Sequence, residues 1–257
     1  MKFVTFNIRT DKNQDGENSF CYRKPLVLRT IAEQQPDIIC FQEVLPHVAD
    51  WLRENLTGFV TLGCGRSRGA LLDDEQLTVA YRADKYNLVE MNTFWMSPTP
   101  YVPGSRFEEQ SSCPRVCTEV LLFERATEQL VRVVNVHLDH RGAEARRLGL
   151  KQALTHIDSH ELFPNAATII AGDYNDEPDS VIFDAFNEHP GYVDITKNVG
   201  RTFHNFGKKD DESYQIDYIW VRGNLECKNV EKWTLCEDGV YLSDHYPICA
   251  ELVWKNE

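Results

Sequence analysis

Two short polar segments in the second half of the chain carry the residue types of a hydrolytic site. Asp173 and Asn175 follow an apolar run that reads as a buried strand, and Asp244 and His245 precede another. Alternate side chains of an extended backbone point to the same side, so Asp173 and Asn175 can together hold one water and one phosphoryl oxygen. Carboxylate, amide and imidazole groups in this arrangement are suited to activating water and binding an oxyanion.

Three further polar clusters come directly after apolar runs. Asn7 closes the first run, Glu43 follows the second, and His137 with Asp139 ends a third. Rigid strands hold the loops at their ends, and layered α/β proteins build active sites there. Taken alone, a single such cluster is better explained by an Asx turn or a solvated strand end. All five in one chain predict one shared polar centre.

Asp217 lies inside an apolar run, where an unpaired charge would be costly. His245 is the partner we expect. A carboxylate that fixes one ring nitrogen leaves the other nitrogen free and raises the imidazole pKa. The sequence leaves open whether His245 acts as a base or as a charged phosphate clamp.

Weaker candidates for substrate contact stand beside these clusters. Arg141 can grip a phosphate through two donors, although a surface arginine at a helix start is an equally good reading. Tyr81 ends a strand-like run and Arg9 stands two residues after Asn7. His140 is expected to face away from His137, because side chains alternate along a strand.

Apolar spacing predicts alternating strands and helices. Adjacent strands need antiparallel pairing and helical crossovers need parallel pairing, so we expect mixed sheets with outer helices in one domain, residues 1–257. Segments 98–115 and 198–213 are expected to be loops at the rim of the site. The expected strands are 2–8, 37–42, 58–63, 77–82, 116–123, 130–138, 166–172, 216–221 and 246–254, and the expected helices are 24–34, 46–56, 143–160 and 179–187.

Charge and composition limit the classes of partner that the protein can bind. The 257 residues carry a net charge of -13 without any block of Lys or Arg, which argues against stable binding of duplex DNA. The negative charge is still compatible with a small phosphorylated substrate or a short single strand of nucleic acid, because a bound cation can offset the negative field of the site. The 8 cysteines form no CxxC pair, which favours reduced thiols in the cytoplasm. No apolar run approaches the roughly 20 residues of a membrane span.

The polar segments at the strand ends, taken together and in this order, resemble the endonuclease/exonuclease/phosphatase superfamily. This superfamily includes DNase I, abasic-site endonucleases, inositol polyphosphate 5-phosphatases, sphingomyelinases and poly(A) deadenylases. Residues 93–97 and 137–142 are similar to a bacterial branch related to the deadenylase-type 3′-5′ exonucleases. The resemblance implies a DNase I-like α/β fold, a four-layer α/β/β/α sandwich. The matching segments are Phe6-Asn7, Gln42-Glu43, Asn135 to Leu138, Gly172 to Asn175, Ile216 to Ile219 and Ser243 to Pro247.

The resemblance also implies a phosphoesterase that depends on Mg²⁺, with Mn²⁺ as a substitute. Some branches have an acidic residue where Arg9 stands, so its absence favours a single metal centred on Glu43. The implied metal ligands are Asn7, Glu43 and Asp244, and the implied catalytic residues are His137, Asp173, Asn175, Asp217 and His245.

The substrate stays open at this point. A 3′-5′ exonuclease acting on a single-stranded end would need stacking surfaces, which Trp95, Tyr101 and Phe107 could provide. A phosphatase of a sugar or lipid headgroup would need a compact basic pocket. Arg106, Arg115 and Arg141 could build that pocket. A catalytically silent binding module of the same fold is the alternative of another class. A catalytically silent module would be expected to lack Glu43, Asp173 or His245, and all three residues are present.

Overall fold

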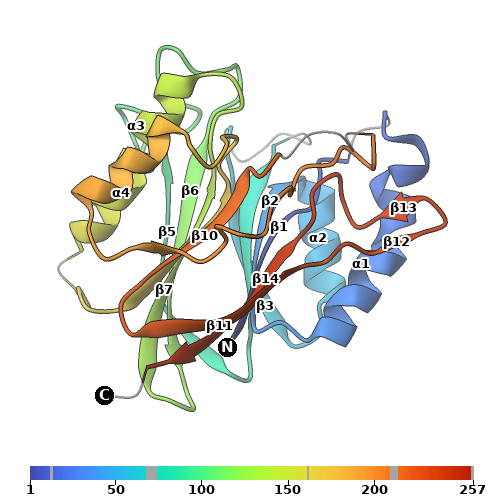
Figure 1. The fold of residues 1–257 in the computed structure, drawn as a ribbon, viewed down its shortest axis with the longest axis horizontal. Coiled ribbons are helices and arrows are strands. Elements are labelled where there is room, and N and C mark those ends of the chain that lie inside the picture. Colours follow the sequence, from blue (N-terminus) through green and yellow to red (C-terminus); the bar gives the residue numbers. More distant parts are fainter. Residues whose placement is uncertain (12–13, 68–73, 161, 209–213, 256–257) are drawn as a thin grey trace.

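The computed structural model describes residues 1–11, 14–67, 74–160, 162–208 and 214–255. Within these residues two six-stranded sheets pack face to face, and helices cover the outer face of each sheet (Figure 1). Parallel and antiparallel neighbours occur in both sheets. The four-layer α/β/β/α arrangement of mixed sheets is therefore confirmed.

The first sheet has the strand order β11-β14-β1-β2-β4-β3. The parallel pair β1 and β2 lies at its centre, and α1 and α2 cover its outer face. The bounds are β1 Lys2–Asn7, β2 Ile38–Val44, β3 Phe59–Gly65, β4 Gln76–Arg82, β11 Leu225–Lys232, β14 Ile248–Trp254, α1 Phe20–Gln34 and α2 Pro46–Asn55.

The second sheet has the strand order β5-β6-β7-β8-β10-β9. Helix α3 connects the parallel strands β7 and β8, and with α4 it packs on the outer face. The bounds are β5 Tyr86–Trp95, β6 Val116–Glu124, β7 Gln129–His137, β8 Ala167–Asp173, β9 Val193–Asp194, β10 Asp217–Arg222, α3 Ala143–Asp158 and α4 Ala185–Glu188. Short elements complete the order: η1 Gly16–Asn18, η2 Val181–Asp184, β12 Cys236–Glu237 and β13 Val240–Tyr241.

Central strands are apolar on both faces because each face meets a different layer. Phe3 packs between the two sheets, whereas the next residue, Val4, packs under α1 and α2. Val133 and Val134 divide in the same way between the inter-sheet layer and the layer under α3. This explains why the sequence shows continuous apolar runs rather than strict alternation.

Strand direction brings the polar strand ends to one end of the sandwich. Asn7 pairs with Gln42 where β1 and β2 end in parallel, and His137 pairs with Asp173 where β7 and β8 do the same. Asp217 begins the antiparallel strand β10 and also pairs with Asp173. Polar ends of both sheets therefore meet in one place.

Five strands in the described part of the chain were not expected from the sequence: β5, β11 and the two-residue strands β9, β12 and β13. Strands β5 and β11 each lie at the edge of a sheet, and most of their residues are exposed or only partly buried. Polar residues interrupt the apolar ones in both, which breaks the apolar signal. None of the helices in the described ranges is long and apolar enough to cross a membrane.

Candidate active site

Unusual backbone conformations turn three side chains toward the site. Arg9, Glu43 and Asn175 have φ values of 65°, 61° and 52°, a region that residues other than glycine seldom adopt. The pairing register of β2 with β4 shifts between Phe41 and Val44, so Glu43 leaves the regular ladder. Such conformations cluster at functional sites.

Gly172 allows the close approach of β7 and β8 directly behind Asp173. Its φ is +147°, and a Cβ at this position would lie 1.8 Å from the carbonyl oxygen of Val136. Any side chain would therefore push the two strands apart and move Asp173 away from His137.

The amide of Asn7 joins carboxylates from the two sheets. Its Nδ2 donates to Glu43 Oε1 and to Asp173 Oδ2, each at 3.0 Å. Its Oδ1 accepts from the backbone N–H of Arg9 at 3.0 Å. Asn7 therefore orients the two acids, and the second lone pair of its Oδ1 stays available, so its role as a metal ligand stays a prediction.

His245 and Asp217 form the expected pair, with Nδ1 of His245 at 2.9 Å from Oδ2 of Asp217. Burial by itself disfavours the charged imidazole, but the charge and hydrogen bond of Asp217 raise the pKa of His245 to about 10. The other ring nitrogen, Nε2, lies 3.8 Å from Oδ2 of Asp173. His245 therefore presents a positive charge to the site at neutral pH.

Asp173 lies at the centre of the cluster. Burial and the charge of Asp217 raise the pKa of Asp173 to about 7. The backbone N–H of Asn175 donates to its Oδ1 at 2.9 Å, and Nε2 of His137 lies 3.5 Å from its Oδ2. Burial and the nearby Arg115 keep the pKa of His137 well below its usual value, so this second imidazole is neutral.

Glu43 is held as an ionised carboxylate. Burial alone would raise the pKa of Glu43, but the charge of Arg9 and the backbone N–H of Thr10 hold it below its usual value. The Thr10 bond to Oε2 measures 2.7 Å. Arg9 itself lies 3.1 Å from Asp15 and 3.5 Å from Asp244, so it neutralises acids at the rim.

These groups line a cleft of 430 Å³. Arg115 is buried in its wall, and its Nη2 lies 3.1 Å from Nδ1 of His140. Arg66 and Glu75, paired at 2.6 Å, line it as well. The remaining lining residues are Arg9, Thr10, Glu43, Cys113, His137, His140, Asp173, Asn175, Phe203, Tyr214, Ile216, Asp244 and His245.

The expected orientation of His140 is wrong, because β7 ends at His137 and strand alternation no longer applies. His140 lines the cleft. Asp139 turns inward instead, where it accepts from the backbone N–H of Gly142 at 2.7 Å and from Ser111.

Tyr81 does not reach the cleft, contrary to expectation. It pairs with Ile38 at the start of β2 and packs between the sheets. Strand β4 runs antiparallel to β2, so its last residues lie at the opposite end of the sandwich.

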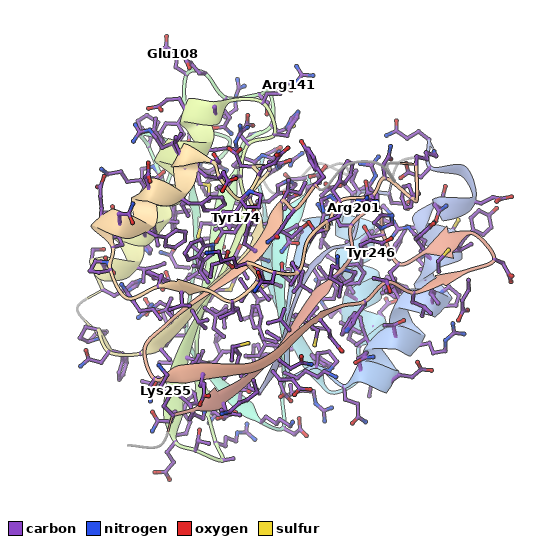
Figure 2. All side chains as sticks on the ribbon, viewed as in Figure 1. Glu108, Arg141, Tyr174, Arg201, Tyr246 and Lys255 are labelled. Carbon is purple, nitrogen blue, oxygen red and sulfur yellow. The ribbon has the colours of Figure 1, made fainter. Side chains whose placement is uncertain are left out.

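Arg141 lines an adjoining groove of 490 Å³ that shares His140 and Asn175 with the cleft. Figure 2 shows it at the outer edge of the molecule, far from Lys255.

Asp217 lies behind His245 rather than at the surface of the cleft.

The aromatic residues expected for stacking lie elsewhere. Trp95 donates through its indole to the carbonyl of Arg66, Tyr101 is exposed, and Phe107 packs against the layer under α3. Arg106 bonds the carbonyl of Ser111. The cleft contains different aromatic residues, Phe203 and Tyr214.

Arg23 of α1 stabilises the site from beneath and was missed in the sequence. It is fully buried, and its Nη1 donates to the carbonyls of Ile8 and Leu242, each at 2.8 Å. These carbonyls flank the segments that carry Asn7 and Asp244. A charged residue on an amphipathic helix normally indicates a solvated face, so its sequence position gave no signal.

The residues present fit a divalent cation. Glu43, His137 and Asp173 offer ligand atoms that lie within 4.8 Å of one another. Burial and the charge of Glu43 raise the pKa of Asp244, and Asp173 is affected in the same direction. A cation would relieve this repulsion, and the carboxylate oxygens are ligands that Mg²⁺ accepts.

A model of the Endonuclease/Exonuclease/phosphatase family matches residues 4–245. The chain belongs to this family. Members hydrolyse phosphoester bonds, so the protein is a phosphoester hydrolase with a cleft that can hold a divalent metal.

Solved structures of similar proteins support the assignment. An endonuclease/exonuclease/phosphatase from Bacteroides vulgatus is 30% identical, with a TM-score of 0.92 over 99% of this chain and 98% of that chain. A mannosyl-6-phosphatase from Bacteroides thetaiotaomicron VPI-5482 is 25% identical, with a TM-score of 0.89 over 99% and 100%. The catalytic domain of human Nocturnin, 18% identical with a TM-score of 0.79 over 99% and 93%, shares the fold.

Proposed function

We propose that this hydrolase uses Mg²⁺, with Mn²⁺ as a substitute, to cleave the phosphate ester of a small polyhydroxyl molecule such as a sugar phosphate. The observation that carries the proposal is the wall of the cleft next to Glu43. There Arg115 and the Arg66–Glu75 pair add charge and hydrogen-bonding groups beside His137.

Glu43 and Asp244 would hold the metal, which supplies positive charge against the phosphoryl oxygens. Asp173 is suited to take a proton from the attacking water, because a pKa of about 7 lies near the working pH. Asn175 holds Asp173 through its backbone N–H. The charged ring of His245 and the neutral ring of His137 donate to phosphoryl oxygens as the ester P–O bond breaks.

The size and charge of the cleft support a small substrate. Its volume of 430 Å³ lies in the range of small-molecule sites, about 300–1,000 Å³. An ion pair such as Arg66–Glu75 offers donors and acceptors that suit hydroxyl groups. The likeness to a mannosyl-6-phosphatase points in the same direction.

A single-stranded nucleic-acid end is the second candidate substrate. Phe203 and Tyr214 line the cleft with ring centroids 5.9 Å apart, and aromatic rings can stack on a base. A lipid headgroup phosphate would occupy the same basic wall as a sugar phosphate. The cytoplasmic location also stays a proposal, supported by eight unpaired cysteines.

One panel of substrates tests these choices. Mannose 6-phosphate and other hexose phosphates, phosphoinositides, a short single strand and a plasmid are each incubated with enzyme and Mg²⁺ at several salt concentrations. We expect the sugar phosphates to be cleaved fastest and with a shallow salt dependence, since few charges hold them. Efficient cleavage of the single strand alone would select the second candidate. Nicking of plasmid at physiological salt would refute the preference for small substrates.

A further inference from the structure

A second cluster of metal-ligating side chains lies outside the cleft, where α3 ends against the outer face of the second sheet. Glu119 extends from β6, His156 lies in the last turn of α3, and His160 follows that turn. Nε2 of His156 lies 3.1 Å from Oε2 of Glu119, and Nε2 of His160 lies 3.1 Å from the same oxygen. None of the three lines the cleft.

The separations suit a tetrahedral ion. Zinc bonds of about 2.0–2.1 Å to nitrogen and oxygen place neighbouring ligand atoms about 3.3 Å apart in a tetrahedral site. The three ligand atoms here lie within 4.8 Å of one another, and two of the three separations are 3.1 Å. An ion could therefore enter with only small side-chain movements.

The local backbone positions both rings on one side. His156 and His160 are four residues apart, the spacing that places two side chains on the same helix face. The backbone N–H of Ser159 bonds the carbonyl of Thr155, and that of His160 bonds the carbonyl of Ile157. A turn therefore follows the end of α3 at Asp158 and leads to His160.

The surroundings fix the ligands. Arg132 pairs with Oε1 of Glu119, an oxygen that Nε2 of His160 also approaches at 3.1 Å, and both imidazoles lie 3.1 Å from Oε2. Hydrogen bonds of this kind orient the carboxylate ligands of metal sites. The rings of Phe94 and His156 lie 4.5 Å apart, and those of His156 and His160 lie 4.9 Å apart.

Charge and access also favour a cation here. The carbonyl end of a helix carries partial negative charge, and the cluster lies at that end of α3. The side chains of His156 and His160 are 20% and 14% exposed, so an ion in solution can reach them.

We propose that Glu119, His156 and His160 bind a structural Zn²⁺ ion that fastens the end of α3 to the second sheet. Two nitrogen ligands favour zinc over magnesium, which prefers oxygen. Asn92 stands beside the site, with its amide 3.1 Å from Nε2 of His156. Rotation of that amide would bring its oxygen to the open fourth position.

Calorimetric titration of the full-length Glu43→Gln chain with Zn²⁺, in excess Mg²⁺, tests the proposal. The Glu43→Gln substitution and the excess Mg²⁺ keep the cleft from competing for zinc. We expect one equivalent to bind, at least tenfold weaker binding in His160→Gln and in His156→Gln, and unchanged binding in His189→Gln. His189 is the matched control, because it pairs with Asp158 rather than Glu119. Binding that is equal in all variants, or no binding in the parent, overturns the proposal and leaves only an ion-pair cluster.

Two further measurements distinguish loss of zinc binding from a folding defect, and binding at this site from binding by cysteine thiolates. Zn²⁺ should raise the thermal midpoint of the wild-type chain, and the rise should disappear in His160→Gln; no rise in the wild type contradicts the clamp. Co²⁺ bound at the site should give tetrahedral d–d bands without thiolate charge transfer. A thiolate band would assign the ion to exposed thiols such as Cys21 or Cys236 and overturn the proposal.

Discussion

The side-chain amide of Gln42 donates a hydrogen bond to Oδ1 of Asn135 at 2.8 Å, across the interface between the two sheets. Asn135 in turn donates to the carbonyls of Phe41 and Thr78 at 2.9 and 3.1 Å. Both amides are fully buried. Because each stands close in sequence to a site residue, Gln42 before Glu43 and Asn135 before His137, this bond sets the spacing of the catalytic groups.

Replacing Asn135 by leucine should therefore reduce both stability and turnover. The change removes three buried hydrogen bonds, one from Gln42 and one from each of the carbonyls of Phe41 and Thr78, at a cost of about 0.5–1.5 kcal/mol for each bond. Urea unfolding and kcat would measure the two effects. Asn229→Leu is the matched control, since Asn229 is exposed on β11. A leucine variant as stable and active as the parent would show that the cross-sheet bond is dispensable.

Replacing Asp217 by asparagine should move the alkaline limit of activity to lower pH. The protonated form of His245 is the active one in the proposed function, so activity falls as pH rises through its pKa of about 10. Asparagine removes the charge that raises this pKa. The profile of kcat/KM against pH would record the shift, with the exposed Asp84→Asn as the control.

The same two residues should act as a unit. Losses in Asp217→Asn and His245→Ala combine far less than additively when each residue works through the other. An unmoved alkaline limit together with fully additive losses would separate Asp217 from the function of His245.

Acidic pH should inhibit the enzyme through Asp173. The carboxylate that accepts a proton exists above the pKa of about 7, so kcat/KM should fall about tenfold per pH unit below it. A divalent ion in the cleft stabilises the ionised carboxylate, so raising the Mg²⁺ concentration should move this limit to lower pH. Profiles at several Mg²⁺ concentrations would test the coupling, which is refuted if the limit does not move.

Chelation should abolish hydrolysis, and Mg²⁺ alone should restore it. Glu43→Gln should weaken metal binding at the cleft at least tenfold, because it removes the ionised ligand while preserving size. Circular dichroism should change little, since one ion at a surface cleft does not hold the fold together. Full activity in excess EDTA would contradict metal dependence.

The sequence revealed the central strands and their polar ends because these strands are apolar on both faces. It did not reveal β11, whose exposed residues are polar, or β5, where Leu88, Val89 and Met91 are exposed and polar residues stand between the apolar ones. Strand direction was also hidden, and this explains the misplacement of Tyr81. Each polar residue was recognised at a strand end, but only the topology shows which ends come together.

The remaining part of the site depends on long-range contacts. Arg66 reaches the cleft from the irregular backbone after β3, where no periodicity places a side chain, whereas Arg115, a candidate for the basic pocket, reaches it from directly before β6. Gln42 and Asn135 were recognised only as members of sequence motifs. Their hydrogen bond could not be predicted, because it depends on how the two sheets pack against each other. The hydrogen bonds by which Asn7 joins Glu43 and Asp173 were likewise hidden, because the sequence does not show which atoms of an amide have partners.

Arg23 links two stretches that synthesis separates, since it contacts Ile8 nearby and Leu242, 219 residues further along the chain. While a ribosome is still making the protein, the first strand and its asparagine exist without the histidine that completes the chemistry. A messenger RNA truncated before the codon for His245 would therefore yield an inactive chain rather than an enzyme of reduced activity. The appearance of hydrolysis in a translation reaction would therefore time the arrival of the last strand rather than the beginning of folding.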